Sequence, residues 1–162
     1  MTTAVLLGLP LAFEPAERGI MRRLPRPPAA PVLDAILIER VVLVGILMLA
    51  GSFGMFLLAV ERGESMPEAR TIAMNVFVAI EIAYLFNCRS LRLPVTAVAA
   101  FSNPWAWAGA GLQLALQLAI TYWAPLNAAF ATAPIDARAW GEITVIALLA
   151  MGIIELEKRW RA

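Results

Sequence analysis

Long uncharged, apolar segments constrain the fold of this chain more than any other feature. Residues 93–135 contain no charged side chain, and residues 41–60 form a second uncharged run. A helix needs about 20 apolar residues to cross the roughly 30 Å hydrocarbon core of a bilayer. We therefore predict an all-α, polytopic membrane helical bundle with four full transmembrane helices and a partial N-terminal helix. The predicted spans are residues 41–60, 71–88, 104–124 and 139–158.

Tryptophan side chains lie near both ends of the last two predicted spans. About 27 Å of helix separates Trp105 from Trp123, and about 30 Å separates Trp140 from Trp160. Indole rings prefer the two membrane–water interfaces, so this spacing favours a bilayer. The alternative is a very hydrophobic helical bundle of a water-soluble protein, which does not account for the spacing.

Basic residues are distributed unevenly between the predicted spans. Ten of the 13 Lys and Arg side chains fall in three regions, which lie before the first span, after the second span and at the end of the fourth span. Because two spans separate each region from the next, all three regions lie on the same side of the membrane. Cytoplasmic segments carry the excess of Lys and Arg, so we expect these regions and the C-terminus in the cytoplasm. Twelve of the 13 basic residues are Arg, a bias typical of GC-rich bacterial genomes, so we expect the membrane to be a bacterial inner membrane. The ten residues are Arg18, Arg22, Arg23, Arg26, Arg40, Arg89, Arg92, Lys158, Arg159 and Arg161.

Composition excludes several functional classes. The chain has no His and a single Cys, so it offers neither His-based catalysis nor a His/Cys metal site. The 13 Lys and Arg against 12 Asp and Glu leave a net charge of +1, which argues against nucleic-acid binding. We expect no catalytic residue and no cofactor in this chain.

The N-terminal 13 residues are apolar but too few to cross a bilayer. They also lack the basic start of a signal peptide. With the predicted orientation, they form the inner half of a helix that ends at the cytoplasm near Glu14. The chain then divides into this partial helix (1–13), an Arg/Pro-rich cytoplasmic loop (14–40) and a four-helix transmembrane domain (41–162).

Glu81 is the one ionisable side chain deep within a predicted span. Placing a charge there costs roughly 2.5–3.5 kcal/mol, so the carboxyl group needs a compensating role. It either coordinates a cation or, when protonated, hydrogen-bonds a neighbouring helix; Tyr84, one turn along, is within reach.

Other polar residues in the predicted spans are interpreted as packing contacts. We expect Asn75 to bond another helix rather than a ligand. Small and amide side chains recur every four residues along the third span, and such stripes let helices approach and bond across their interface. The stripe consists of Gly109, Gln113, Gln117 and Thr121.

Residues 13–27, which read FEPAERGIMRRLPRP, carry a family resemblance. They resemble the cytoplasmic loop after the sixth membrane helix of P-type cation-transporting ATPases, particularly the calcium-pump-like members. The resemblance continues in order through segments similar to the eighth, ninth and tenth helices of that family. These segments are residues 79–90, 103–105, 122–127 and 152–158.

This resemblance implies particular site residues. Glu81 matches an acidic cation ligand of the eighth helix, and Thr3 matches a Thr in the ligand-bearing stretch of the sixth. Ala4 stands where calcium and sodium/potassium pumps carry Asp, which puts their two-ion stoichiometry in doubt. The loop that contacts the phosphorylation domain in the family corresponds to Glu14, Pro15, Met21, Arg22 and Arg23.

The resemblance also implies what this chain lacks. The phosphorylation, dephosphorylation and nucleotide-hinge motifs of the family are absent from the sequence, so we expect no ATP hydrolysis by this chain alone. ATP and Mg²⁺ belong to the parent protein. The implied partners are the lipid bilayer, the transported cation, and the phosphorylation domain and first six helices of the pump.

Three functions remain open from the sequence. The first is the C-terminal membrane subdomain of a cation pump, which supports the transport helices and supplies one cation ligand. The second is a stand-alone small membrane protein, a regulator or assembly partner, derived from such a pump. The third is an unrelated channel or scaffold, which the lack of a ring of polar residues disfavours.

Overall fold

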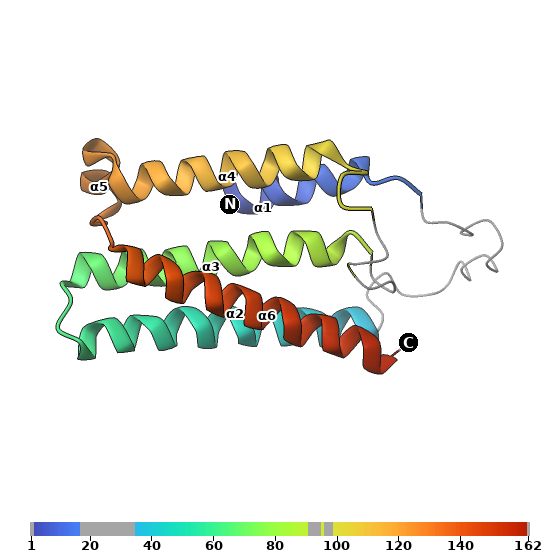
Figure 1. The fold of residues 1–162 in the computed structure, drawn as a ribbon, viewed down its shortest axis with the longest axis horizontal. Helices are drawn as coiled ribbons and strands as arrows, with labels where there is room; N and C mark the ends of the chain where they lie inside the picture. The colour runs from blue at the N-terminus through green and yellow to red at the C-terminus, as the bar shows by residue number, and fades with distance from the viewer. Residues whose placement is uncertain (1, 17–34, 91–94, 96–98, 162) are drawn as a thin grey trace.

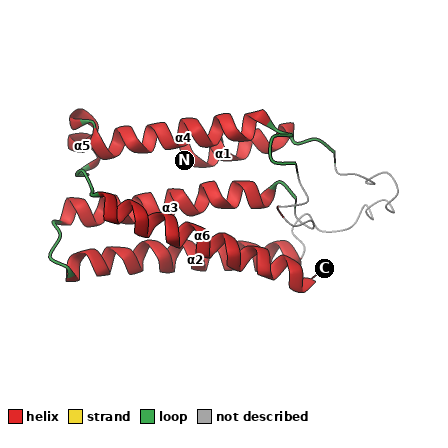
Figure 2. Ribbon diagram, viewed as in Figure 1, coloured by secondary structure: helices red, strands yellow, loops and turns green. Residues whose placement is uncertain are grey.

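The computed structural model describes residues 2–16, 35–90, 95 and 99–161, and every regular element among them is a helix (Figures 1 and 2). The all-α bundle predicted from the sequence is therefore confirmed. The elements are α1 (Thr2–Gly8), the 3-10 helix η1 (Leu9–Phe13), α2 (Ala35–Glu61), α3 (Met66–Cys88), α4 (Pro104–Tyr122), α5 (Ala124–Phe130) and α6 (Ala137–Arg161).

Helix α3 is the central element of the bundle. It packs against α2 and α6 on one side and against α1 and α4 on the other (Figure 1). Two apolar clusters hold these contacts. The larger joins α2, α3 and α6 around Ile72, Ile80 and Ile143, and the smaller joins α1, α3 and α4 around Leu7 and Leu85.

Local sequence signals explain where α3 and α4 begin. Ser65 caps α3 by accepting a hydrogen bond from the backbone N–H of Glu68, whose carboxylate in turn accepts from the Ser65 backbone N–H. This reciprocal pair is a capping box. Asn103 caps α4 in a similar way and is followed by Pro104, whose ring favours the first position of a helix.

Three of the described helices are long and apolar enough to cross a membrane, namely α2, α3 and α6. Helix α4 is not among them. Its 19 residues include Gln113 and Gln117 and two glycines, which lower its mean hydropathy. The prediction of four full transmembrane helices plus a partial one is therefore not confirmed. Residues 2–13 form only a seven-residue helix and a five-residue 3-10 helix, which together are too short to cross.

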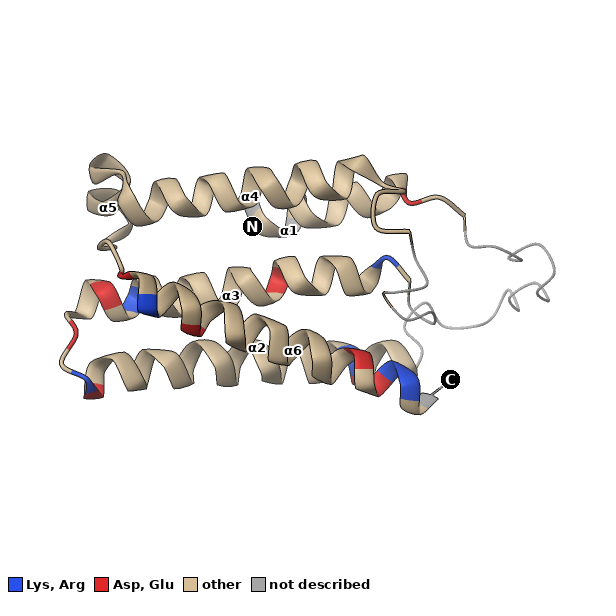
Figure 3. Ribbon diagram, in the orientation of Figure 1, with Lys and Arg blue, Asp and Glu red and all other residues tan. Residues whose placement is uncertain are grey.

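Charged residues gather toward the two ends of the bundle (Figure 3). One end holds α5 and the turn between α2 and α3, and we call it the α5 end. The other holds the end of η1, the start of α4 and the C-terminus, and we call it the Arg89 end. Between the two ends, α3 carries one isolated acidic position, Glu81, which lies nearer the Arg89 end. Large apolar side chains such as Leu49, 70% exposed, and Leu149, 61% exposed, face outward between the ends, as a lipid-facing surface requires.

Glycine allows close helix–helix approaches at two described positions, Gly109 and Gly51. A methyl group at Gly109 would overlap the backbone oxygen of Leu6 and approach Pro10, so α1 and η1 lie directly on α4 at this point. Gly51 similarly lies against Val76 and Ile80 of α3. Small residues at such positions let backbones come together in membranes.

Candidate cation-binding site

Glu81 lies within α3, half-buried and about two turns before Arg89. Its Oε1 accepts a long hydrogen bond of 3.4 Å from the hydroxyl of Thr3 on α1. Its Oε2 is buried and has no hydrogen-bond partner within the part of the chain that the structure describes. A buried carboxylate oxygen that accepts no hydrogen bond destabilises the fold, so a proton or a cation bound at this position would stabilise it.

A cavity of about 430 Å³ opens beside Glu81, between α1, α2 and α3. Thr3 and Tyr84 also line it, so three oxygen-bearing side chains face one space. The remaining walls are mostly apolar: Leu7, Gly8, Leu11, Val41, Val44, Gly45, Met48, Leu85 and Cys88. Low-polarity walls strengthen the attraction between a carboxylate and a cation, because less water competes for either charge.

The structure brings together the two residues that the sequence assigned to cation binding. Glu81 and Thr3 are 78 positions apart in the chain, yet their side chains are within hydrogen-bonding distance. Tyr84 lines the same cavity, but no hydrogen bond among the described residues joins it to Glu81. Within the same described ranges, no group of three or more His, Cys, Asp or Glu side chains gathers around a common point.

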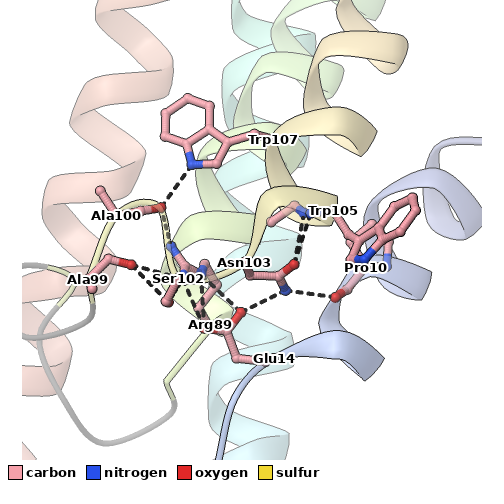
Figure 4. Close-up of polar contacts among 10 residues, drawn as sticks. Pro10, Glu14, Arg89, Ala99, Ala100, Ser102, Asn103, Trp105 and Trp107 are labelled. Carbon is pink, nitrogen blue, oxygen red and sulfur yellow. Dashed lines mark hydrogen bonds and ion pairs between the residues drawn. The ribbon is translucent and has the colours of Figure 1, made fainter.

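A second polar cluster lies at the Arg89 end and contains Glu14 (Figure 4). Arg89, which follows the last residue of α3, donates from Nε and Nη2 to the Glu14 carboxylate at 2.9–3.2 Å. Asn103 donates to the same carboxylate at 2.9 Å. Arg89 is buried and Glu14 is partly buried, with the Arg89 side chain 3% and the Glu14 side chain 14% exposed.

Two opposing effects act on the Glu14 carboxyl group. Its burial raises the pKa, whereas hydrogen bonds from Arg89 and Asn103 and the positive charge of Arg89 lower it, and the lowering dominates. The pKa of Glu14 therefore lies below its ordinary value, and the carboxylate is ionised at neutral pH.

The other predicted loop residues are less informative. Pro15 is exposed beside this cluster. Met21, Arg22 and Arg23 lie outside the described residues, so their assignment to the loop stays a prediction. Sequence reasoning missed the roles of Arg89 and Asn103. Arg89 was counted only among the basic residues, and the Asn-Pro pair at 103–104 signalled a helix start but not its bond to Glu14.

Asn75 and the small-polar stripe of α4 form a packing interface, as predicted. The Asn75 amide donates to the hydroxyl of Thr121 at 3.1 Å and to the backbone oxygen of Thr71 at 2.9 Å. The stripe residues Gly109, Gln113 and Gln117 are buried with Thr121 on the inner face of α4. This face holds α4 against α1 and α3.

Comparison with known proteins gives a consistent result. Residues 1–160 match the family model described as "Cation transporting ATPase, C-terminus". The chain is 45% identical over 147 residues to probable cation-transporting ATPase F of Mycobacterium tuberculosis, which covers 91% of the chain and 16% of that relative. It is 29% identical to cation-transporting ATPase pma1 of Synechocystis, over 86% of the chain. It is 28% identical to calcium-transporting ATPase type 2C member 2 of mouse, over 93% of the chain. The chain spans 16% of the length of each of these relatives.

Proposed function

Because the chain belongs to the family of cation-transporting ATPase C-terminal regions, we propose that it is the C-terminal membrane subdomain of an ATP-driven cation pump. The family membership confirms the resemblance carried by residues 13–27 and agrees with helices that span a membrane more than once. In this role the chain supports the transport helices and supplies one ligand to the transported cation.

The observation that carries this proposal is the position of Glu81. Its carboxylate lies within the central helix, beside Thr3 and a cavity, and one of its oxygens has no hydrogen-bond partner among the described residues. Hard cations take oxygen ligands, and Ca²⁺ takes six to eight of them. Glu81 and Thr3 alone are too few for such a shell, so we place the remaining ligands on other helices of the pump.

The same proposal assigns orientation and partners. The Arg89 end and the C-terminus face the cytoplasm of a bacterial inner membrane, in keeping with the excess of basic residues there. The 19 residues of α4 rise about 28 Å, so α4 serves as a further span that depends on its neighbours to cover its polar face. ATP and Mg²⁺ act on the phosphorylation domain, which contacts the segment after Glu14, and this chain alone hydrolyses no ATP.

The proposal is tested with Glu81→Gln in a complete pump that ends in this region. Gln keeps the size of the side chain but removes the charge that attracts the cation. We expect the cation concentration for half-maximal ATP turnover to rise about tenfold, which corresponds to a loss of about 1.4 kcal/mol. The matched control is Glu61→Gln, an exposed carboxylate at the α5 end, which should leave this concentration unchanged. An unchanged value in the Glu81→Gln pump would assign Glu81 to packing.

A further inference from the structure

Arg89 connects three segments that are far apart in the chain. We propose that it is a positioning residue that couples Glu14, at the end of η1, to α3, the helix that carries Glu81, and, through the turn at residues 99–102, to α4. This inference rests on the proposed function, because it concerns how a displacement outside the membrane would reach the cation site.

All three guanidinium nitrogens of Arg89 are engaged. Nε and Nη2 bind the Glu14 carboxylate, as described above. Nη1 donates to the backbone oxygen of Ala100 at 2.9 Å, and Nη2 donates to that of Ala99 at 3.1 Å and to the Ser102 hydroxyl at 2.6 Å. The rigid planar fork of Arg can hold these groups at once, whereas an ammonium group on a flexible stem cannot. The end of α3 is thereby fixed both to Glu14 and to the turn that precedes α4.

Asn103 provides a second connection between the same segments. Its Nδ2 donates to the Glu14 carboxylate and, at 2.8 Å, to the backbone oxygen of Pro10 in η1. Its Oδ1 accepts from the backbone N–H groups of Trp105 and Ala106 at 3.0 and 3.2 Å (Figure 4). One fully buried side chain thus caps α4 and holds the end of η1. A movement of Glu14 would therefore shift the Asn103 side chain, which binds η1 through Nδ2 and the start of α4 through Oδ1.

An apolar contact lies directly beneath this network. Leu7 of α1 packs with Leu85 of α3 and with Ala106 and Ala110 of α4, and all four side chains are buried. If the carboxylate of Glu14 moved away from Arg89, the buried guanidinium group would lose its counter-ion, which is strongly unfavourable. These residues therefore move together, so a displacement at Glu14 reaches α3 two turns from Glu81.

A second ion pair with a buried Arg, among those that the described residues form, differs in the segments that it joins. Arg40 of α2 contacts Glu157 of α6 at 2.9 Å, with Arg40 3% exposed. Both residues belong to long helices that already pack together, whereas Glu14 lies outside any helix. The Arg89 cluster is the contact that attaches a non-helical segment to the ends of two helices.

The coupling can be tested in this chain in detergent micelles by hydrogen–deuterium exchange. Glu14→Gln keeps the shape of the side chain but removes its charge. We expect exchange to become about threefold or more faster both in residues 2–16 and in the first turn of α4, 90 positions away. The control Glu142→Gln breaks the ion pair with Arg62 at the α5 end and should leave both regions unchanged. Faster exchange confined to residues 2–16 would overturn the proposal.

The functional consequence is tested in the complete pump with Arg89→Lys, which keeps the charge but loses the fork. We expect maximal turnover per folded pump molecule to fall about tenfold, with half-saturation by the cation within about twofold of the parent. Normal turnover in the folded variant would overturn the coupling role. Failure of the proposed function would appear differently. The cation concentration for half-maximal turnover would then be unchanged in the Glu81→Gln pump, and the hydrogen–deuterium exchange result in this chain alone would not be affected.

Discussion

The ammonium group of Lys158 on α6 lies 2.6 Å from the backbone oxygen of Asn87 and 2.7 Å from that of Ser90, at the end of α3. The last carbonyl groups of a helix have no partner within the helix and need an outside donor. A positive charge at this terminus also interacts favourably with the helix dipole. Lys158, only 4% exposed, therefore fastens the C-terminal helix to the central one.

We expect Lys158→Met to destabilise the folded bundle by about 1.5–3 kcal/mol, the usual value for hydrogen bonds to a charged group. Met fills a similar volume but offers no N–H donor to the two carbonyl groups. The free energy of unfolding is measured by titrating the detergent-solubilised chain with denaturing detergent. Arg159→Met, at the exposed neighbouring position, is the control and should change stability little. Equal effects of the two substitutions would contradict the capping role.

A pair of glycines on α4 gives a second prediction. Gly109→Ala should destabilise the bundle by about 1–3 kcal/mol, because the added methyl group overlaps the backbone of α1. Gly111→Ala meets nothing within 4 Å and should stabilise the helix by up to about 1 kcal/mol, since Ala favours helices more than Gly. The same unfolding titration compares the two variants. If Gly109→Ala were as harmless as Gly111→Ala, the close approach of α1 to α4 would be wrong.

The Glu14–Arg89 contact predicts a pH dependence of stability. The pKa of Glu14 is below its ordinary value of 4.5 in the folded chain, so the folded state binds a proton less readily than the unfolded state. The stabilisation is then complete above the unfolded pKa and is lost as the pH falls through the lower, folded pKa. Thermal unfolding of the parent chain and of Glu14→Gln between about pH 7 and pH 3 should show a stability difference that shrinks below about pH 4.5. A difference that stays constant over this range would show that the Glu14 charge does not stabilise the fold.

The sequence predicted the helical bundle because hydropathy is a local property. The uncharged runs at residues 41–60 and 93–135 each indicate membrane helices without knowledge of their neighbours. Residues 104–124 were predicted as a full span, but Gln113 and Gln117, which face the interior, lower the hydropathy of α4. The expectation that Asn75 bonds another helix is confirmed by its hydrogen bond to Thr121.

Pairing between distant segments could not be read from the sequence. Glu14 and Arg89 are 75 positions apart, and Asn103 and Pro10 are 93 apart. Nothing in the local pattern distinguishes Arg89 from the other basic residues near the ends of the spans. Thr3 and Glu81 were brought together only through the family resemblance, because their contact depends on how α1 packs against α3.

The central position of α3 also has a consequence for biosynthesis. Chains emerge from the ribosome N-terminus first, so α3 is complete before α4 and α6 exist. At that moment Asn75 lacks its Thr121 partner, and the end of α3 lacks the ammonium group of Lys158. Until then these polar groups of α3 need other partners. They are satisfied on opposite sides of the helix and in two steps, at Asn75 when α4 arrives and at the end of α3 when α6 follows.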